Sequence, residues 1–373
     1  MIVPFGFLKA STGVSLPPSY IINEIDQLTV NPTGTWTGID VLDSTHYVVS
    51  YQGDFTDGYV SIISHDGSGG SLTEIKMLEF DPSRGTSTSI CVIDSTHFAI
   101  AYSGPDIDGF IKTFSVDGSY NITLVDTLEQ DTNNNSNNSL ILIDSTHLML
   151  AYQGTSGDGF VKTFSIDAVT ADNITQIDVL EFDTLVATWI SLRQITASFY
   201  VIAYAGVGND GFVKTFSIDG SYDNITQVDV LEHDTVQGMF NSVAVIDATH
   251  FAISYGGSGN DGWVKTFSID GSADNITEID SLEYDTANGD YTSLCLIDNT
   301  HLIVAYSGVS RNGTASIIDL DGSYNLTKAD TLIYINPTNL FNQIVQLDDE
   351  HYAIVCQGDG NDCITVTLTI NGI

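Results

Sequence analysis

Six histidines lie in nearly identical short segments, and they are the first residues in this sequence whose type and spacing could do chemistry. The segments read DSTH, DATH, DNTH or DDEH. A row of imidazoles could bind a transition metal, but equivalent side chains of repeated units lie too far apart to share one ion at about 2 Å. The Asp of each segment can instead close a tight turn on its own backbone. We expect all six histidines to fix turns and none to bind metal: His46, His97, His147, His250, His301 and His351.

A second recurring position lies seven residues before the Asp of each turn, and five of its seven occupants are aromatic. Clustered exposed rings are typical of surfaces that stack on a sugar or anchor a protein partner. The same rings could also plug a channel and touch only each other, so both interpretations stay open. The candidate binding residues are Trp36, Trp189, Phe240, Tyr291 and Phe341, and the two other occupants of the position are Ser87 and Asn137.

Catalytic motifs are absent from the sequence. It contains no GxSxG, no HExxH and no P-loop, and its carboxylates are too numerous for one glycosidase pair to stand out. Acidic turns such as 104–109 offer the oxygen ligands that Ca²⁺ prefers, but none has the spacing of an EF-hand. We predict that the protein is not an enzyme and uses no cofactor, and we leave calcium binding by the acidic turns open.

The elements that position these residues follow from an internal repeat. The histidine segments, with Phe199 in the slot of a degraded fourth copy, follow each other every 50–52 residues. Each copy contains four runs rich in Val, Ile, Phe, Tyr and Thr, bounded by Asp, Ser, Asn and Gly, which are signals of strands and turns. Seven copies of four strands predict an all-β fold, a seven-bladed β-propeller with four antiparallel strands in each blade.

The two ends of the chain predict how the ring closes. The last copy lacks a fourth strand, and the missing phrase occurs at residues 22–33, which match residues 274–285. We therefore expect residues 22–30 to form the outer strand of the blade that holds residues 342–370. A closed ring removes free sheet edges. The predicted organisation is an apolar N-terminal arm at 1–19 and a propeller at 20–373.

The phrase DGFVKTFSID, which recurs with small changes, is the predicted third strand of each blade. Its Phe and Val should pack between blades. Its Lys, as in Lys112 and Lys162, should be structural, either in an ion pair with an Asp or as a cation that extends to the surface from an apolar stem. Cys356 and Cys363 flank a turn, and whether they pair is left open.

Charge excludes several kinds of partner. The chain has 48 acidic and 10 basic residues, a net charge of −38. Such a surface cannot neutralise a row of phosphates, which argues against nucleic acid, and it is repelled by anionic membranes. No run reaches the length of about 18 apolar residues that a membrane span needs, so we expect no membrane insertion.

Residues 20–373 resemble bacterial and bacteriophage seven-bladed propellers built from repeats such as VLDSTHYVVSY followed by DG. The first nineteen residues look like the apolar openings of tailed-phage virion proteins. This resemblance implies a non-enzymatic structural or attachment module of a virion or extracellular surface, which binds a glycan or a protein partner through one propeller face and other virion proteins through residues 1–19. The alternative is a cation-assisted propeller hydrolase or lyase that acts at the mouth of the central channel.

Overall fold

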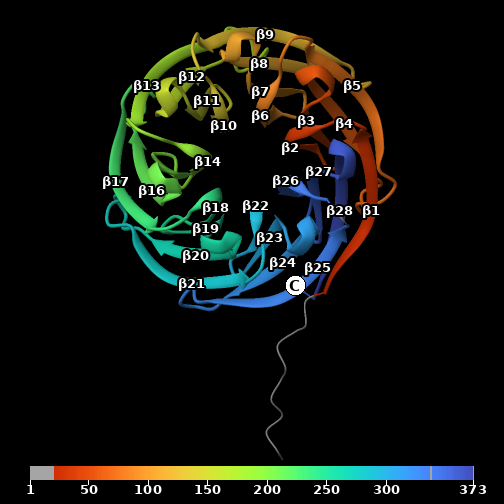
Figure 1. The fold of residues 1–373 in the computed structure, drawn as a ribbon. Helices are drawn as coiled ribbons and strands as arrows, with labels where there is room; N and C mark the ends of the chain where they lie inside the picture. The colour runs from red at the N-terminus through yellow and green to blue at the C-terminus, as the bar shows by residue number, and fades with distance from the viewer. Residues whose placement is uncertain (1–20, 337, 373) are drawn as a thin grey trace, which may run out of the picture.

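The computed structural model describes residues 21–336 and 338–372, which form seven four-stranded antiparallel sheets arranged in a ring (Figure 1). The sequence therefore predicted the fold class and the number of blades correctly. Blades 1 to 4 hold β2 (Thr35–Asp43), β3 (His46–Gln52), β4 (Gly58–Ser64) and β5 (Thr73–Asp81); β6 (Thr86–Asp94), β7 (His97–Ser103), β8 (Gly109–Val116) and β9 (Ile122–Asp131); β10 (Ser136–Asp144), β11 (His147–Gln153), β12 (Gly159–Ser165) and β13 (Thr175–Asp183); β14 (Thr188–Gln194), β15 (Phe199–Ala205), β16 (Gly211–Ile218) and β17 (Ile225–Asp234).

The remaining three blades repeat the plan, and the last one takes its outer strand from the beginning of the chain. They hold β18 (Met239–Asp247), β19 (His250–Gly256), β20 (Gly262–Ser268) and β21 (Thr277–Asp285); β22 (Asp290–Asp298), β23 (His301–Ser307), β24 (Gly313–Leu320) and β25 (Leu326–Ile335); β26 (Leu340–Gln346), β27 (His351–Gln357), β28 (Cys363–Asn371) and β1 (Ile21–Asn31). A short 3₁₀ turn joins the second and third strands of each blade: η1 (Asp54–Thr56), η2 (Pro105–Ile107), η3 (Thr155–Gly157), η4 (Val207–Asn209), η5 (Ser258–Asn260), η6 (Val309–Arg311) and η7 (Asp359–Asn361).

The core is divided into seven apolar clusters, and each cluster lies between two neighbouring blades. The second strand of a blade faces a neighbouring blade on both sides, so its side chains are buried almost without interruption, as in β7, where only His97 is partly exposed. Between blades 1 and 2, Val48, Ile62, Phe98 and Phe114 are fully buried together. Each such side chain contributes about 1.5–3 kcal/mol by leaving water. The outermost strands alternate between exposed and half-buried residues because one side of them faces solvent.

Carboxylates join one blade to the next. On the outer strands, Asp126 Oδ2 accepts a hydrogen bond from Ile174 N of the following blade at 2.9 Å, and the same contact recurs from blade to blade. The other acceptors of this kind are Asp26, Asp178, Asp229, Asp280 and Asp330. The abundant Asp of the sequence, for which calcium binding was left open, is thus used in part to connect the blades.

The recurring lysines take part in a similar contact. Lys112 Nζ donates to the carbonyl of Phe80 at 2.6 Å and lies 3.3 Å from Asp81 Oδ2, both in the preceding blade. Tyr102 donates to the same carboxylate at 2.8 Å. Lys162 contacts blade 2 in the same way, with Asp131 3.9 Å away. The prediction of structural Lys–Asp pairs is confirmed.

The ring closes where β1 pairs with β28, from Ile21 opposite Asn371 to Asn31 opposite Cys363. The red strand of the N-terminus thus lies against the blue strand of the C-terminus (Figure 1). The closure predicted for residues 22–30 is confirmed. The arm predicted at residues 1–19 lies outside the described residues.

Two further features bear on the sequence-based predictions. All four cysteines have free thiols, so Cys356 and Cys363 are not bonded to each other. In the part of the chain that the structure describes, no helix has the length and apolar character needed to cross a membrane.

Candidate functional site on the collar face

The five aromatic residues singled out from the sequence share an unusual backbone position. Each inner strand contains a register shift near its beginning, as between Thr35 and Gly38 in β2, and the bulged residue has a left-handed backbone. The φ angle of Trp36 is 53° and that of Phe240 is 57°. A left-handed conformation costs a non-glycine residue roughly 1–2 kcal/mol. Because Ser87 and Asn137 have it too, the bulge belongs to the blade design, and the choice of an aromatic side chain there is a separate feature.

The five rings form a closed circuit of contacts, which we call the aromatic collar (Trp36, Trp189, Phe240, Tyr291 and Phe341). The centroid distances are 4.6 Å for Trp36–Phe341, 4.8 Å for Phe341–Tyr291, 4.2 Å for Tyr291–Phe240 and 4.2 Å for Phe240–Trp189. Trp36 and Trp189 stack at 6.3 Å and complete the circuit. All five rings remain half-buried and line an open recess of about 120 Å³. Both properties considered from the sequence, mutual ring contact and an accessible surface, therefore occur together.

Polar side chains immediately below the collar fix its backbone. Thr88 Oγ1 donates to the Trp36 carbonyl at 2.6 Å, and Asn342 Nδ2 donates to the Tyr291 carbonyl at 3.0 Å. Thr37 and Thr292 make the equivalent contact to the carbonyls of Phe341 and Phe240. Inner strands of neighbouring blades do not pair, so these bonds satisfy strand-edge groups that would otherwise lack partners. They hold the rings at fixed positions around the channel mouth.

The collar lies on the face that carries the connections between strands two and three and those between blades. Gly85 N, before blade 2, donates to the Thr56 carbonyl at 2.7 Å, and Asn135 N donates to the Ile107 carbonyl at 2.9 Å. We call this face the collar face. Several apolar tips are exposed around its rim: Phe55 (93% exposed), Leu185, Val207, Val236 and Val309.

One carboxyl group beside the collar is unlike all others on this face. Burial raises the pKa of Asp290 to about 6, and the Arg311 guanidinium opposes that shift only in part. Asp290 Oδ1 is buried and has no hydrogen-bond partner among the described residues. It lies close to the Phe240 ring, since a Cβ added to Gly256 would be 2.9 Å from Asp290 Oδ1 and 3.2 Å from Phe240 Cδ2. A carboxyl that titrates near neutral pH can both accept and donate a proton during a reaction.

Sequence reasoning missed Asp290 because it is one of many acidic residues. A signal was present, however. Asp290 directly precedes the collar position, and it is the one charged residue among seven equivalents, the others being Thr35, Thr86, Ser136, Thr188, Met239 and Leu340.

The histidine turns lie on the opposite face, which we call the turn face. His147 Nδ1 lies 2.9 Å from Asp144 Oδ1 of the same turn, as predicted for a histidine that fixes the turn. The His147 ring also stacks on Tyr222 of the next blade with centroids 3.8 Å apart, and Tyr222 donates to Asp144 Oδ2 at 2.7 Å. These hydrogen bonds lower the pKa of Asp144 to about 2, although burial opposes the shift. His46 with Tyr120 and His250 with Tyr324 repeat the stacking in blades 1 and 5.

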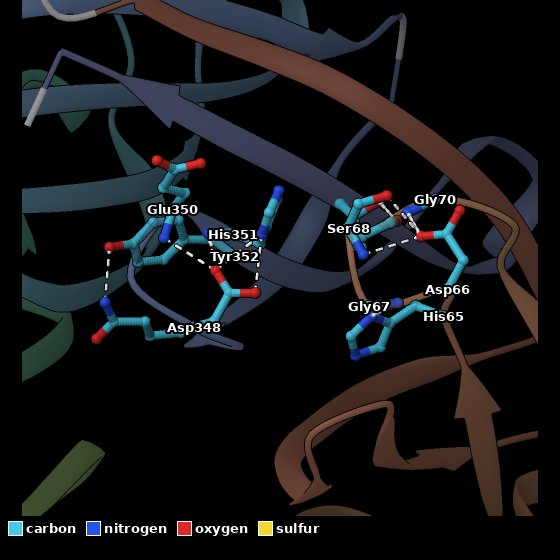
Figure 2. A network of polar contacts seen from close by, with 12 residues as sticks. His65, Asp66, Gly67, Ser68, Gly70, Asp348, Glu350, His351 and Tyr352 are labelled. Carbon is cyan, nitrogen blue, oxygen red and sulfur yellow. Dashed lines mark hydrogen bonds and ion pairs between the residues drawn. The ribbon is translucent and has the colours of Figure 1, made fainter.

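At the closing seam the arrangement is different. Figure 2 shows the turn of blade 7, with His351 beside Asp348, and the connection between β4 and β5 of blade 1, where Asp66 accepts hydrogen bonds from Ser68 and Gly70. Thr367 of β28 donates to the Gly69 carbonyl at 2.6 Å and joins the two blades. In residues 21–336 and 338–372, no three His, Cys, Asp or Glu side chains are grouped so that they could hold a metal ion.

No family model matches the chain, and the comparison with curated proteins finds no match. Solved structures do match. The chain is similar to the periplasmic gluconolactonase of Pseudomonas aeruginosa (13% identity, TM-score 0.61, 81% of this chain and 86% of that one). It is similar to the WD40 domain of Toxoplasma gondii coronin (12%, 0.63, 96% and 88%) and to the Chaetomium thermophilum Sqt1 protein bound to the N-terminus of ribosomal protein L10 (12%, 0.58, 94% and 99%).

The fold is a seven-bladed β-propeller. At these identities the likeness shows the fold alone, and the finer resemblance to virion proteins finds no support in it. The Sqt1 structure contains a bound protein segment, the N-terminus of ribosomal protein L10, and a protein partner for this chain stays a prediction.

The comparisons correct the prediction of a non-enzymatic attachment module. That prediction relied on the absence of catalytic motifs, yet the same fold serves a gluconolactonase. The physical reason is that a propeller brings side chains of separate blades to one mouth, so a site such as Asp290 beside Phe240 leaves no local motif in the sequence.

Proposed function

We propose that the collar face carries the active site of a hydrolase for a small cyclic sugar ester, with the aromatic collar as the platform and Asp290 as the group that moves the proton. The observation that carries the proposal is the half-buried Asp290 carboxyl, whose pKa is raised to about 6 and which lies beside the Phe240 ring. The likeness to a gluconolactonase supports a lactone as the class of substrate. Flat rings such as those of the collar stack on the apolar face of a sugar.

In this proposal the ionised Asp290 accepts a proton from a water molecule, and the water oxygen attacks the carbonyl carbon of the ester. The bond between that carbon and the ring oxygen then breaks, and the protonated Asp290 returns its proton to the leaving oxygen. One lactone and one water give one hydroxy acid. The base form exists above the pKa, so the rate should rise as the pH increases through about 6.

The test is hydrolysis of glucono-δ-lactone and other sugar lactones, measured as the rate of acid release above the spontaneous rate. Asp290→Asn should lower the enzymatic rate by about 10²–10⁴-fold, the usual contribution of a general base. Asp106→Asn, which removes an exposed carboxylate of the same face, is the matched control. Wild-type rates equal to buffer across the panel, or an Asp290→Asn variant as fast as wild type, would contradict the proposal.

A second candidate function is the binding of a protein segment across the same face, favoured by the exposed apolar tips of the rim. Phe55 is 93% exposed and Leu185 64% exposed, and the net charge of −38 would favour a basic segment. A peptide array that varies net charge tests this directly. Binding biased toward basic peptides and lost in Phe55→Ser/Leu185→Ser is expected, whereas binding that ignores both charge and these substitutions would refute it.

A further inference from the structure

The channel below the collar presents a ring of hydroxyl donors. At the fourth position of the inner strands, a serine oxygen accepts the backbone N–H of the next blade, as in Leu140 N to Ser89 Oγ at 2.9 Å and Leu192 N to Ser139 Oγ at 3.0 Å. Ser191, Ser242 and Ser293 accept in the same way. A hydroxyl that accepts can still donate its own hydrogen. For these five serines, no protein acceptor of that hydrogen occurs among the described residues.

Four of these serines line a cavity of about 140 Å³ together with Arg193: Ser89, Ser139, Ser191 and Ser242. The cavity adjoins the collar recess, since both are lined by Thr37, Thr88 and Asn138. For scale, an apolar cavity of about 150 Å³ accepts a molecule of the size of benzene. The channel therefore has room for a small solute as well as water.

Arg193 supplies the charge of this cavity. Arg at this position occurs in blade 4 alone. The equivalent residues of the other blades include Asp40, Cys91 and Cys295. One guanidinium N–H donates to the Leu192 carbonyl at 2.8 Å, and the side chain has four further N–H donors. Within the described residues no carboxylate lies within ion-pair distance of Arg193. Guanidinium groups remain charged in proteins and match oxyanions with two parallel hydrogen bonds.

The nearest candidate for neutralising Arg193 is already engaged elsewhere. Asp40 accepts hydrogen bonds from Val41 N at 2.8 Å and Val92 N at 2.7 Å, one on each oxygen. Cys295 also faces Arg193, but burial raises the pKa of its thiol to about 11, so it is neutral at physiological pH. The cavity thus combines one cation and several free donors. Among the described residues, Asp40 is the carboxyl whose charge acts on Arg193, and it forms no ion pair with the guanidinium.

We infer that the channel binds a small oxyanion, a carboxylate or a phosphate group, held by the Arg193 guanidinium and the serine hydroxyls beneath the collar. This inference depends only on the channel and holds whether or not the collar face is a hydrolase site. The net negative charge of the chain does not oppose this inference. Acidic residues farther than about 10 Å from the anion are largely screened at 0.1 M salt, so the donors within the channel decide the binding.

Bromide is a suitable first probe, because anomalous diffraction locates it in crystals of the full chain. A bromide peak next to Arg193 is expected, and its displacement by inorganic phosphate or acetate would support an oxyanion site. A wild-type channel without bromide and without either oxyanion would overturn the inference, and this result does not depend on any variant folding.

Calorimetric titration at constant ionic strength then separates the two oxyanions. Phosphate binding tighter than acetate binding points to a phosphate group, and the reverse points to a carboxylate. Arg193→Gln should weaken the better ligand at least tenfold, whereas Arg84→Gln removes the same charge outside the channel and should leave binding unchanged. Equal affinity of wild type and Arg193→Gln would overturn the assignment. Binding of the better ligand and lactone hydrolysis are separate measurements, so failure of one is distinguishable from failure of the other.

Discussion

On the turn face, the tyrosine that stacks on a histidine occurs in a regular alternation of blades. On the collar face, the residue at the collar position changes from blade to blade without regularity. Tyr120, Tyr222 and Tyr324 occur in every second blade, and each stacks on a histidine of the preceding blade. The collar position instead holds two Trp, two Phe, one Tyr, one Ser and one Asn.

The two faces also differ in what their polar groups contact. Tyr222 and His147 both bind the Asp144 carboxylate, so the polar atoms of this turn are satisfied within the protein. Beside and below the collar, Asp290 Oδ1 lacks a partner and most donors of Arg193 are unused by the protein. Where the copies vary regularly the residues serve the assembly of the ring, and where they vary irregularly they leave groups available to a ligand.

The largest effect is expected from opening the ring, which would affect both faces at once. Deletion of residues 1–33 removes β1, which leaves β28 with an unpaired edge and takes the buried side chains of Ile22 and Val30 out of the core. We expect either a melting temperature that is more than about 10 °C lower or a protein that is insoluble. Deletion of residues 1–15 is the control, and equal stability of both deletions would disprove the role of β1 in closure.

The next largest effect concerns the collar itself. Phe240→Ala/Tyr291→Ala removes two half-buried rings that contact each other at 4.2 Å. Because the rings are partly exposed, we expect a loss of about 1–2 kcal/mol per ring, less than the 3–5 kcal/mol typical of a fully buried ring. Binding of lactones or peptides should fall with it. Denaturant unfolding and the binding assay on the same variant decide: a large stability loss with unchanged binding would make the collar a plug only.

A buried histidine at the collar end of β17 gives a prediction of opposite sign. Both ring nitrogens of His233 lack partners among the described residues, and burial lowers the pKa of its imidazole to about 3. Blades 1 and 3 have Phe80 and Phe182 at this position. His233→Phe should therefore stabilise the protein by about 1–3 kcal/mol at neutral pH.

The pH dependence of the His233→Phe gain has a definite sign. The folded-state pKa is lowered below the usual 6.5, so the unfolded state binds the proton first and wild-type stability falls as the pH drops below about 6.5. The gain should be larger at pH 5 than at pH 8 by about 2 kcal/mol. Unfolding curves at the two pH values measure it, and an equal gain at both would contradict a buried neutral imidazole.

The smallest effect is expected on the turn face. His250→Gln keeps a hydrogen-bonding side chain near Asp247 and should cost about 1 kcal/mol at most, without any change in lactone hydrolysis or anion binding. Altered activity from this distant substitution would remove the distinction between the two faces.

The fold could be predicted from the sequence because the same pattern of strands and turns occurs seven times. Strand patterns, turn residues and the misplaced phrase at residues 22–33 all agree on one closed ring. The collar residues were found for the same reason, since a register of aligned copies exposes the positions that differ. Whether Trp36 and its neighbours bind a ligand stays a prediction.

Other parts of the site could not be obtained in this way. Nothing in the residue types indicates a left-handed backbone at Trp36 or Phe240, because the bulge arises from strand pairing in three dimensions. Asp290 and Arg193 acquire their properties from burial beside other blades, which composition does not report. The prediction of a non-enzyme was wrong for a related reason: it treated missing local motifs as a missing site.

The pairing of β1 with β28 has a consequence for the synthesis of the protein. Asp26 and Thr367, which meet in the closed ring, are 341 residues apart. At about 5–20 residues per second, the ribosome needs roughly 17–70 seconds to make that interval. Throughout this time the segment IINEIDQLTVN has no β28 to pair with. Glu24 and Asp26 give it negative charges that oppose pairing with the same segment of another nascent chain. The acidic residues of this strand thus protect the chain from aggregation before the ring has closed.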